Sequence, residues 1–214
     1  MNAFRVILLC TFFILSSTAC NLKVGGVPPA PKKYYVLNDA PHIGIRSFAR
    51  RPFSIMVRQA TAPPMIDSCK IIFSDNPSTR GFYRFASWVE PPPKRFTFLL
   101  ARRMEEADLF ASVLRRPMAV PIDLQLCLEL CDFYHDISNK PGAVKISVRM
   151  TLIDSRRQVM VANKCFSMSG EVDSFDAAGA VRGFDQTVSK ILDQVVVWLD
   201  EITGSLPAAI TDTF

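Results

Sequence analysis

The chain has 214 residues, of which 49% are hydrophobic and 21% are charged, and its formal net charge is +5. This length and apolar content fit one domain of ordinary size with a filled core. After the N-terminal segment, no stretch is long and apolar enough to span a bilayer, which excludes a bundle of membrane helices. The basic residues are dispersed in pairs such as Arg102-Arg103, so we expect no nucleic-acid-binding surface.

The N-terminal segment has the layout of a secretory signal. A polar start with Arg5 precedes an apolar run over 6–15, and small residues over 16–19 lead to Cys20. A cysteine directly after such a site resembles a bacterial lipobox, in which the thiol is acylated and the preceding peptide is removed. We therefore predict a lipoprotein signal peptide over 1–19 and lipidation, including palmitate, at Cys20. A plain signal peptide with an incidental cysteine is the alternative.

The next segment, 20–33, is predicted to be the lipid anchor and an extended tether. Its glycine pair, Gly25-Gly26, is followed by Pro28-Pro29-Ala30-Pro31, and proline stiffens such a linker. Short runs of strand-forming residues bounded by proline or turn residues follow the tether. They predict strands over 34–37, 53–59, 70–73 and 81–88.

Apolar residues at three- and four-residue steps predict two helices. The first covers roughly 94–112, and the second runs from an N-cap at Ser174 to a C-terminal glycine near Gly204. Between them, alternating leucines predict a strand over 123–133 with one core face. The remaining segments, 144–154 and 159–169, predict a hairpin.

This order of elements predicts an α+β fold, an α/β two-layer sandwich. We expect a mixed β-sheet of five to six strands with two helices packed on one face. The sheet and helices form a single domain over 34–204, and a loose tail covers 205–214.

Four cysteines remain in the mature chain after the anchor. In an oxidising compartment they are candidates for disulfides, with the pairing open. Two of them, Cys127 and Cys131, lie roughly 13 Å apart along one strand, which is too far for a bridge to each other. The alternative is that all four are small buried apolar groups. The candidates are Cys69, Cys127, Cys131 and Cys165.

The strand over 81–88 carries an aromatic cluster that includes Phe82, Phe85 and Trp88. Aromatic residues are enriched in interfaces, so these three are candidates for partner or ligand contact, while ordinary core packing is the alternative. The only histidines are His42, in a proline-flanked loop, and His135, interpreted as a solvated strand-end residue. No spacing indicates a catalytic or metal site, so we expect no enzyme activity, no cofactor and no metal.

Taken together, these segments resemble the ABC-type transport auxiliary lipoprotein family, which includes the paraquat-inducible protein C lipoproteins. The resemblance covers nearly the whole mature chain and rests on the order and spacing of several motifs. After the lipobox cysteine and the tether come Tyr34-Tyr35-x-Leu37, Phe85-Ala86-Ser87-Trp88-Val89-Glu90-Pro91, Leu109-Phe110-x-x-Val113, Cys131-Asp132-Phe133, Val148-Arg149-Met150-Thr151-Leu152-Ile153-Asp154, Phe166 and the C-terminal helix.

The resemblance implies a non-catalytic docking role in an ABC transporter with a mammalian-cell-entry (MCE) protein, a permease and an ATPase. Such systems move lipid between the two membranes of a Gram-negative envelope, and the family carries over Cys20 as the anchor. We expect the protein to face the periplasm, in the outer membrane because Asn21 follows the anchor, and homo-oligomerisation is compatible with this role. The alternative is a structural lipoprotein that supports lipopolysaccharide or outer-membrane-protein assembly.

Overall fold

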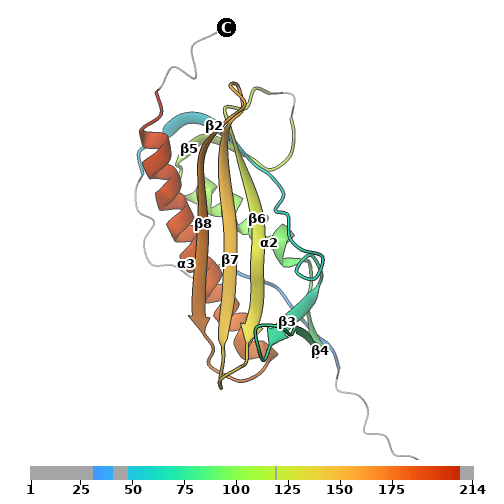
Figure 1. Cartoon of the computed structure of the whole chain (residues 1–214). Helices are drawn as coiled ribbons and strands as arrows, with labels where there is room; N and C mark the ends of the chain where they lie inside the picture. Colours follow the sequence, from blue (N-terminus) through green and yellow to red (C-terminus); the bar gives the residue numbers. More distant parts are fainter. Residues whose placement is uncertain (1–30, 41–47, 119, 208–214) are drawn as a thin grey trace, which may run out of the picture. The chain divides into compact units, whose positions relative to one another are not determined.

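The computed structural model describes residues 31–40, 48–118 and 120–207. Their compact unit begins at Lys32. It contains the strands and helices labelled in Figure 1, which are, in chain order, β1 (Lys33–Tyr35), β2 (Arg51–Val57), β3 (Lys70–Ser74), β4 (Gly81–Trp88), α2 (Pro92–Glu106), β5 (Phe110–Leu114), β6 (Leu124–Asp136), β7 (Ala143–Asp154), β8 (Val159–Glu171) and α3 (Ala177–Gly204).

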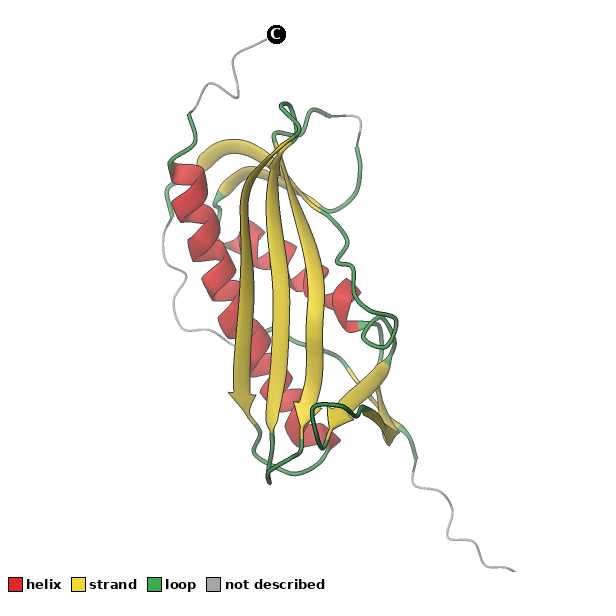
Figure 2. Ribbon diagram, in the orientation of Figure 1, coloured by secondary structure: helices red, strands yellow, loops and turns green. Residues whose placement is uncertain are grey.

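The strands form one mixed sheet of eight, built around the long strand β6. Its N-terminal part pairs in parallel with β2, which pairs with β5, and its C-terminal part pairs in parallel with β3. Beyond β3 lie β4 and then β1, while β7 and β8 continue the other side as an antiparallel meander. The α+β class is confirmed, and both helices lie on one face of the sheet (Figure 2). The predicted five to six strands were too few.

The missing strand is β5, because the first helix is shorter than predicted. Helix α2 begins with Pro92 after Pro91, a favourable start for a helix. It ends at Glu106, and Asp108 then takes a positive φ of 46° that reverses the chain. Phe110 therefore does not extend the helix to 112 but begins β5, where it pairs with Arg51 of β2.

The core lies between the sheet and the helices. Strand β6 alternates as predicted, and Leu124, Leu126 and Leu130 are completely buried on its helix-facing side. The other side of β6 carries half-exposed residues such as Gln125 and Cys127. Each large apolar side chain that is fully buried contributes about 1.5–3 kcal/mol to folding. The opposite face of this part of the sheet is left open to solvent.

Both ends of α3 differ slightly from the prediction. The N-cap is Asp176, whose carboxylate accepts a hydrogen bond of 2.7 Å from the backbone N–H of Gly179. This bond, and one donated by the Ser174 hydroxyl, lower the pKa of Asp176. Ser174 therefore supports the cap and is not the cap itself. Gly204 is the last helical residue, and Ser205 follows as the C-cap.

Candidate functional site

The predicted aromatic cluster is divided between the core and the surface. Trp88 is only 2% exposed and packs edge-on against Phe133 and Phe184, with ring centroids 6.1 and 5.7 Å away. Phe82 and Phe85 are 36% and 43% exposed. Trp88 therefore belongs to the core, and a contact role is open only to Phe82 and Phe85.

A buried ionic cluster ties the segment after β1 to both helices. Arg103 of α2 places Nη2 2.5 Å and Nε 3.1 Å from the carboxylate of Asp39, whose side chain is fully buried. The hydroxyl of Ser189 on α3 donates a 2.7 Å bond to the same carboxylate, and Arg103 also contacts the more exposed Asp193. A buried charge is stable only when it is paired and hydrogen-bonded. The cluster therefore fixes the start of the domain against the α2–α3 junction.

The neighbouring carboxylate, that of Asp185 on α3, is also partly buried. Burial raises the pKa of Asp185 to about 6, although it accepts a 2.8 Å hydrogen bond from the backbone N–H of Asn38. Beside it, the guanidinium of Arg95 donates a 2.8 Å bond to the carbonyl oxygen of Leu37. Three consecutive residues, 37–39, are thus held by side chains of α2 and α3.

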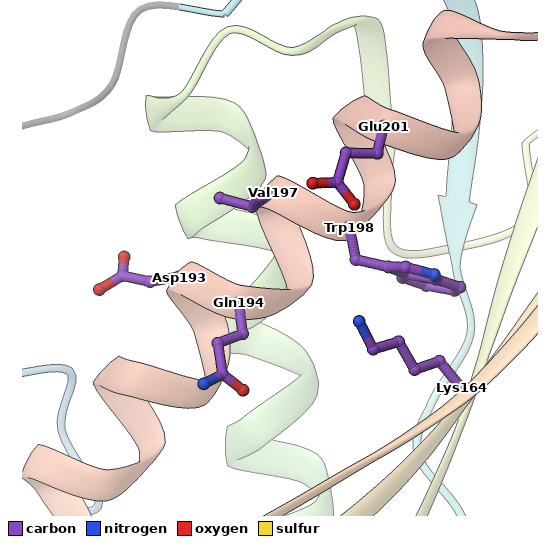
Figure 3. A pocket seen from close by; sticks show the side chains of 6 residues that line it. All are labelled: Lys164, Asp193, Gln194, Val197, Trp198 and Glu201. Carbon is purple, nitrogen blue, oxygen red and sulfur yellow. The ribbon is translucent and has the colours of Figure 1, made fainter.

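A groove of about 450 Å³ lies between α3 and β8 (Figure 3), and we call it the α3–β8 groove. Lys164 extends from β8 toward the helix, where the indole of Trp198 and the carboxylate of Glu201 lie nearby. Among the described residues, neither Lys164 nor Glu201 takes part in an ion pair. Trp198 is only 5% exposed and the amine of Lys164 lies 5.1 Å from the ring centroid of Phe166, so Glu201 is the charge of the groove most available to a ligand. Its lining residues are Lys164, Asp193, Gln194, Val197, Trp198 and Glu201.

The groove runs beside an open sheet edge. Within the described part of the chain, β8 pairs with β7 alone, so about every second of its 13 residues directs its backbone N–H and C=O to the open side. Such an edge is a template for an additional strand. It begins with the exposed side chains Val159 and Met160, which are 49% and 64% accessible.

The four cysteines are free thiols, and none of them is buried in the core. The alternative in which all four are buried apolar groups therefore differs from the structure, while the disulfides stay a prediction. Cys131 on β6 and Cys165 on β8 are separated by β7, and two strand spacings of about 4.8 Å exceed the reach of a disulfide. Cys127 lies on the same strand as Cys131, as the spacing predicted.

The thiols of Cys131 and Cys165 differ in acidity. Hydrogen bonds with Ser147 and Ser167 lower the pKa of Cys165. Desolvation, followed by the nearby carboxylate of Glu129, raises the pKa of Cys131. We therefore expect Cys165 to be the more reactive of the two.

His135 is completely buried, so its interpretation as a solvated residue was wrong. Its Nε2 lies 3.2 Å from the carbonyl oxygen of Pro141, which can only accept, so Nε2 carries the proton. Its Nδ1 therefore accepts from the hydroxyl of Tyr83 at 2.8 Å. Burial lowers the pKa of His135 and raises that of Tyr83 to about 12. A Cβ at Gly142 would lie 2.3 Å from Nε2, so the turn beside the imidazole requires glycine.

Several sequence-based predictions fall outside the described residues. They are the signal peptide over 1–19, the anchor Cys20, the tether up to residue 30, the loop residue His42 and most of the tail. In the described ranges, no helix is long and apolar enough to cross a membrane. The same ranges contain no group of three or more His, Cys, Asp or Glu side chains that could hold a metal ion.

Sequence reasoning missed the α3–β8 groove and the Arg103–Asp39 cluster. Lys164 and Trp198 come from elements that are far apart in the sequence, and no spacing rule connects them. The only sequence signal was a lysine, Lys164, within an otherwise mostly uncharged strand, which is a common device of exposed edges.

Comparisons with known proteins give a consistent picture. The sequence profile of the family described as ABC-type transport auxiliary lipoprotein component matches residues 35–196. No curated protein matches the chain in sequence. The fold is similar to the crystal structure of protein XCC0632 from Xanthomonas campestris, with a TM-score of 0.73 and 22% identity over 80% of this chain and 96% of that one. It is also similar to hypothetical protein CT253 from Chlamydia trachomatis, with a TM-score of 0.52 and 10% identity over 73% and 100%.

Proposed function

Because the chain belongs to the ABC-type transport auxiliary lipoprotein family, we propose that it is a non-catalytic docking component of a transporter that moves lipid through a Gram-negative envelope. Its partner is an MCE-domain protein that works with an ABC permease and an ATPase. Acylated Cys20 anchors the chain in the outer membrane, facing the periplasm. The observation that carries the proposal is the family match over 35–196, which runs from the end of β1 into α3.

The surface that best fits a docking role is the edge of β8 with the α3–β8 groove. An extended segment of the MCE partner would add as a strand to β8, because alternate residues of this 13-residue edge strand offer free backbone groups. Alternate side chains of that strand would lie beside the groove, whose lining includes Val197 and Glu201. The carboxylate of Glu201, which has no ion-pair partner in the described residues, favours a basic side chain next to them.

The proposal is tested by purifying the lipidated protein from gently solubilised envelopes and identifying the bound proteins by mass spectrometry. Recovery of an MCE protein, with or without its permease and ATPase, is expected. Recovery of a lipopolysaccharide or outer-membrane-protein assembly machine would contradict it and favour the structural role.

The docking surface is tested in the same purification with Glu201→Lys. Its matched control is Glu105→Lys, which makes the same charge change on the exposed side of α2. Glu201→Lys is expected to reduce recovery of the MCE protein several-fold while the control leaves it unchanged. Equal recovery with both variants would exclude the groove and leave the family role standing.

A further inference from the structure

A second exposed surface lies where the domain begins, around β1, β4 and the start of β3. Large apolar side chains are unusually accessible there: Tyr34 is 65%, Phe85 43% and Val89 58% exposed. Basic side chains lie among them. We call this surface the basic–aromatic patch, and its members are Lys32, Tyr34, Lys70, Phe82, Arg84, Phe85 and Val89.

The strand pairing connects two members of the patch across β4. Tyr34 pairs with Ser87, and Ser87 pairs with Lys70, so the three form a row across β1, β4 and β3. Paired residues point to the same face of a sheet, and residues two apart on one strand share that face. Tyr34, Ser87 and Lys70 therefore share one face, and Phe82 joins them because the amine of Lys70 lies over its ring. The pairing of β3 with β4 is irregular between Lys70 and Ile72.

Each exposed ring of the patch carries one cation. The amine of Lys70 lies 4.4 Å from the ring centroid of Phe82, and the guanidinium of Arg84 lies 5.2 Å from that of Phe85. The amine of Lys32 lies 5.5 Å from that of Tyr34.

None of these three cations has a carboxylate partner among the described residues. The nearby acid, Glu90, is occupied by Lys94 and Arg95 at 3.2 and 3.8 Å. The patch is therefore apolar and positively charged at once.

The position of the patch in the chain indicates what covers it. The segment between Cys20 and the first described residue, Pro31, has eleven Cα–Cα steps, since 31 − 20 = 11. At up to 3.6 Å per residue it reaches at most about 40 Å. An acylated Cys20 would therefore keep β1 within about 40 Å of the bilayer and raise the effective concentration of the patch there. The patch surrounds this point of attachment.

We propose that the basic–aromatic patch rests directly on the membrane surface, with its rings at the level of the lipid headgroups and its cations at the anionic phosphates. Aromatic side chains favour that interface, and long basic side chains reach from an apolar surface to the charged layer. The contact orients the domain. In Figure 1, β3 and β4 lie at the lower right, while the C-terminal half of α3, which lines the groove, lies at the upper left. The α3–β8 groove is then left free for a partner.

This inference rests on the acylated Cys20 of the proposed function but not on the identity of the transport partner. The first test uses the mature chain with Cys20→Ser, which removes the lipid and isolates the patch. Vesicles of phosphatidylethanolamine and phosphatidylglycerol are mixed with the protein and sedimented. We expect salt-sensitive binding that falls about fivefold for each cation removed, as in Lys70→Ala. The double variant Phe82→Ser, Phe85→Ser is expected to abolish it.

The matched controls alter exposed residues elsewhere. Lys190→Ala removes a cation from α3, and Met160→Ser removes an exposed apolar side chain from β8. Both are expected to bind vesicles like the parent, and thermal unfolding checks that every variant is folded. Failure of the parent to bind vesicles at low salt, or equal loss in the controls, would overturn the inference.

A second test uses the lipidated protein and its native thiols. Cys69 is exposed and its Sγ lies 4.0 Å from the carbonyl oxygen of Val89, beside the patch, whereas Cys165 lies on β8. An environment-sensitive dye is attached to Cys69 in one variant and to Cys165 in another. In each variant the remaining cysteines of the mature chain are changed to serine, except the acylated Cys20. In the same vesicles, a blue shift is expected at Cys69 and not at Cys165. A shift at neither position contradicts direct contact.

The two proposals fail independently. Loss of the MCE protein from the purification with vesicle binding intact would refute the transport role alone. If the patch variants lost the MCE protein but bound vesicles normally, the patch would be a protein interface and the membrane contact would be wrong.

Discussion

Removing the carboxylate of Asp39 is expected to destabilise the domain strongly. In Asp39→Ala the guanidinium of Arg103, whose side chain is only 4% exposed, loses its two contacts to Asp39 and keeps only Ser189 and Asp193. Breaking a buried ion pair from one side costs about 3–5 kcal/mol, because the remaining charge stays out of water.

Urea unfolding measures this cost. With a slope of roughly 1–3 kcal/mol per molar urea, the midpoint should fall by at least roughly 1 M. Glu129→Ala, which breaks the half-exposed pair with Arg149, is the control and should change stability by about 0–1 kcal/mol. Hydrogen exchange should also show faster exchange of the backbone N–H of Asn38 in Asp39→Ala, because its segment is released from α2 and α3.

The physical reason can be separated from simple loss of packing. Adding Arg103→Met to Asp39→Ala removes the stranded charge and keeps an apolar side chain of similar length, so much of the lost stability should return. Two results would contradict this reasoning. Either Asp39→Ala is as stable as the parent, or adding Arg103→Met lowers the stability further by several kcal/mol. Asp39 would then not be needed to neutralise the buried charge of Arg103.

Three further predictions follow from the burial of single groups. Trp88→Ala should lower the free energy of unfolding by about 3–5 kcal/mol while Phe85→Ser leaves it nearly unchanged, and equal losses in urea unfolding would contradict their placement. NMR titration should show one histidine with a pKa below the usual value of about 6.5. The folded state disfavours protonated His135, so neutral His135 contributes fully to stability above about pH 6.5. This contribution is lost as the pH falls through the lowered pKa of the folded state. Two histidines that both titrate at the usual value would contradict this. A small alkylating reagent near neutral pH should modify Cys165 faster than Cys131, and mass spectrometry of the peptides would reveal the opposite order.

The sequence predicted those elements whose apolar residues recur at a regular spacing. The leucines of β6 alternate because one face of the strand is buried. The hairpin of β7 and β8 was predicted because turn residues separate its two strands. Strand β5 was missed because Phe110 continues the three- and four-residue spacing of α2. The reversal at Asp108, where φ is positive, has no signature in that spacing.

The surfaces were less predictable because they depend on tertiary contacts. The sequence singled out Phe82 and Phe85, but not the cation over Phe82, because Lys70 reaches that ring only through the pairing of β3 with β4. It also grouped Trp88 with them, although Trp88 faces the helices and packs on Phe184 of α3. In the same way, the burial of His135 depends on Tyr83 and on a turn that follows β6.

Direct binding between purified proteins tests the docking role most directly. The lipidated protein and the MCE protein recovered with it are each purified in detergent, mixed and separated by gel filtration. We predict a complex of fixed stoichiometry that forms with Glu105→Lys and weakens several-fold with Glu201→Lys. Separate elution of the two proteins at micromolar concentrations would contradict a docking component.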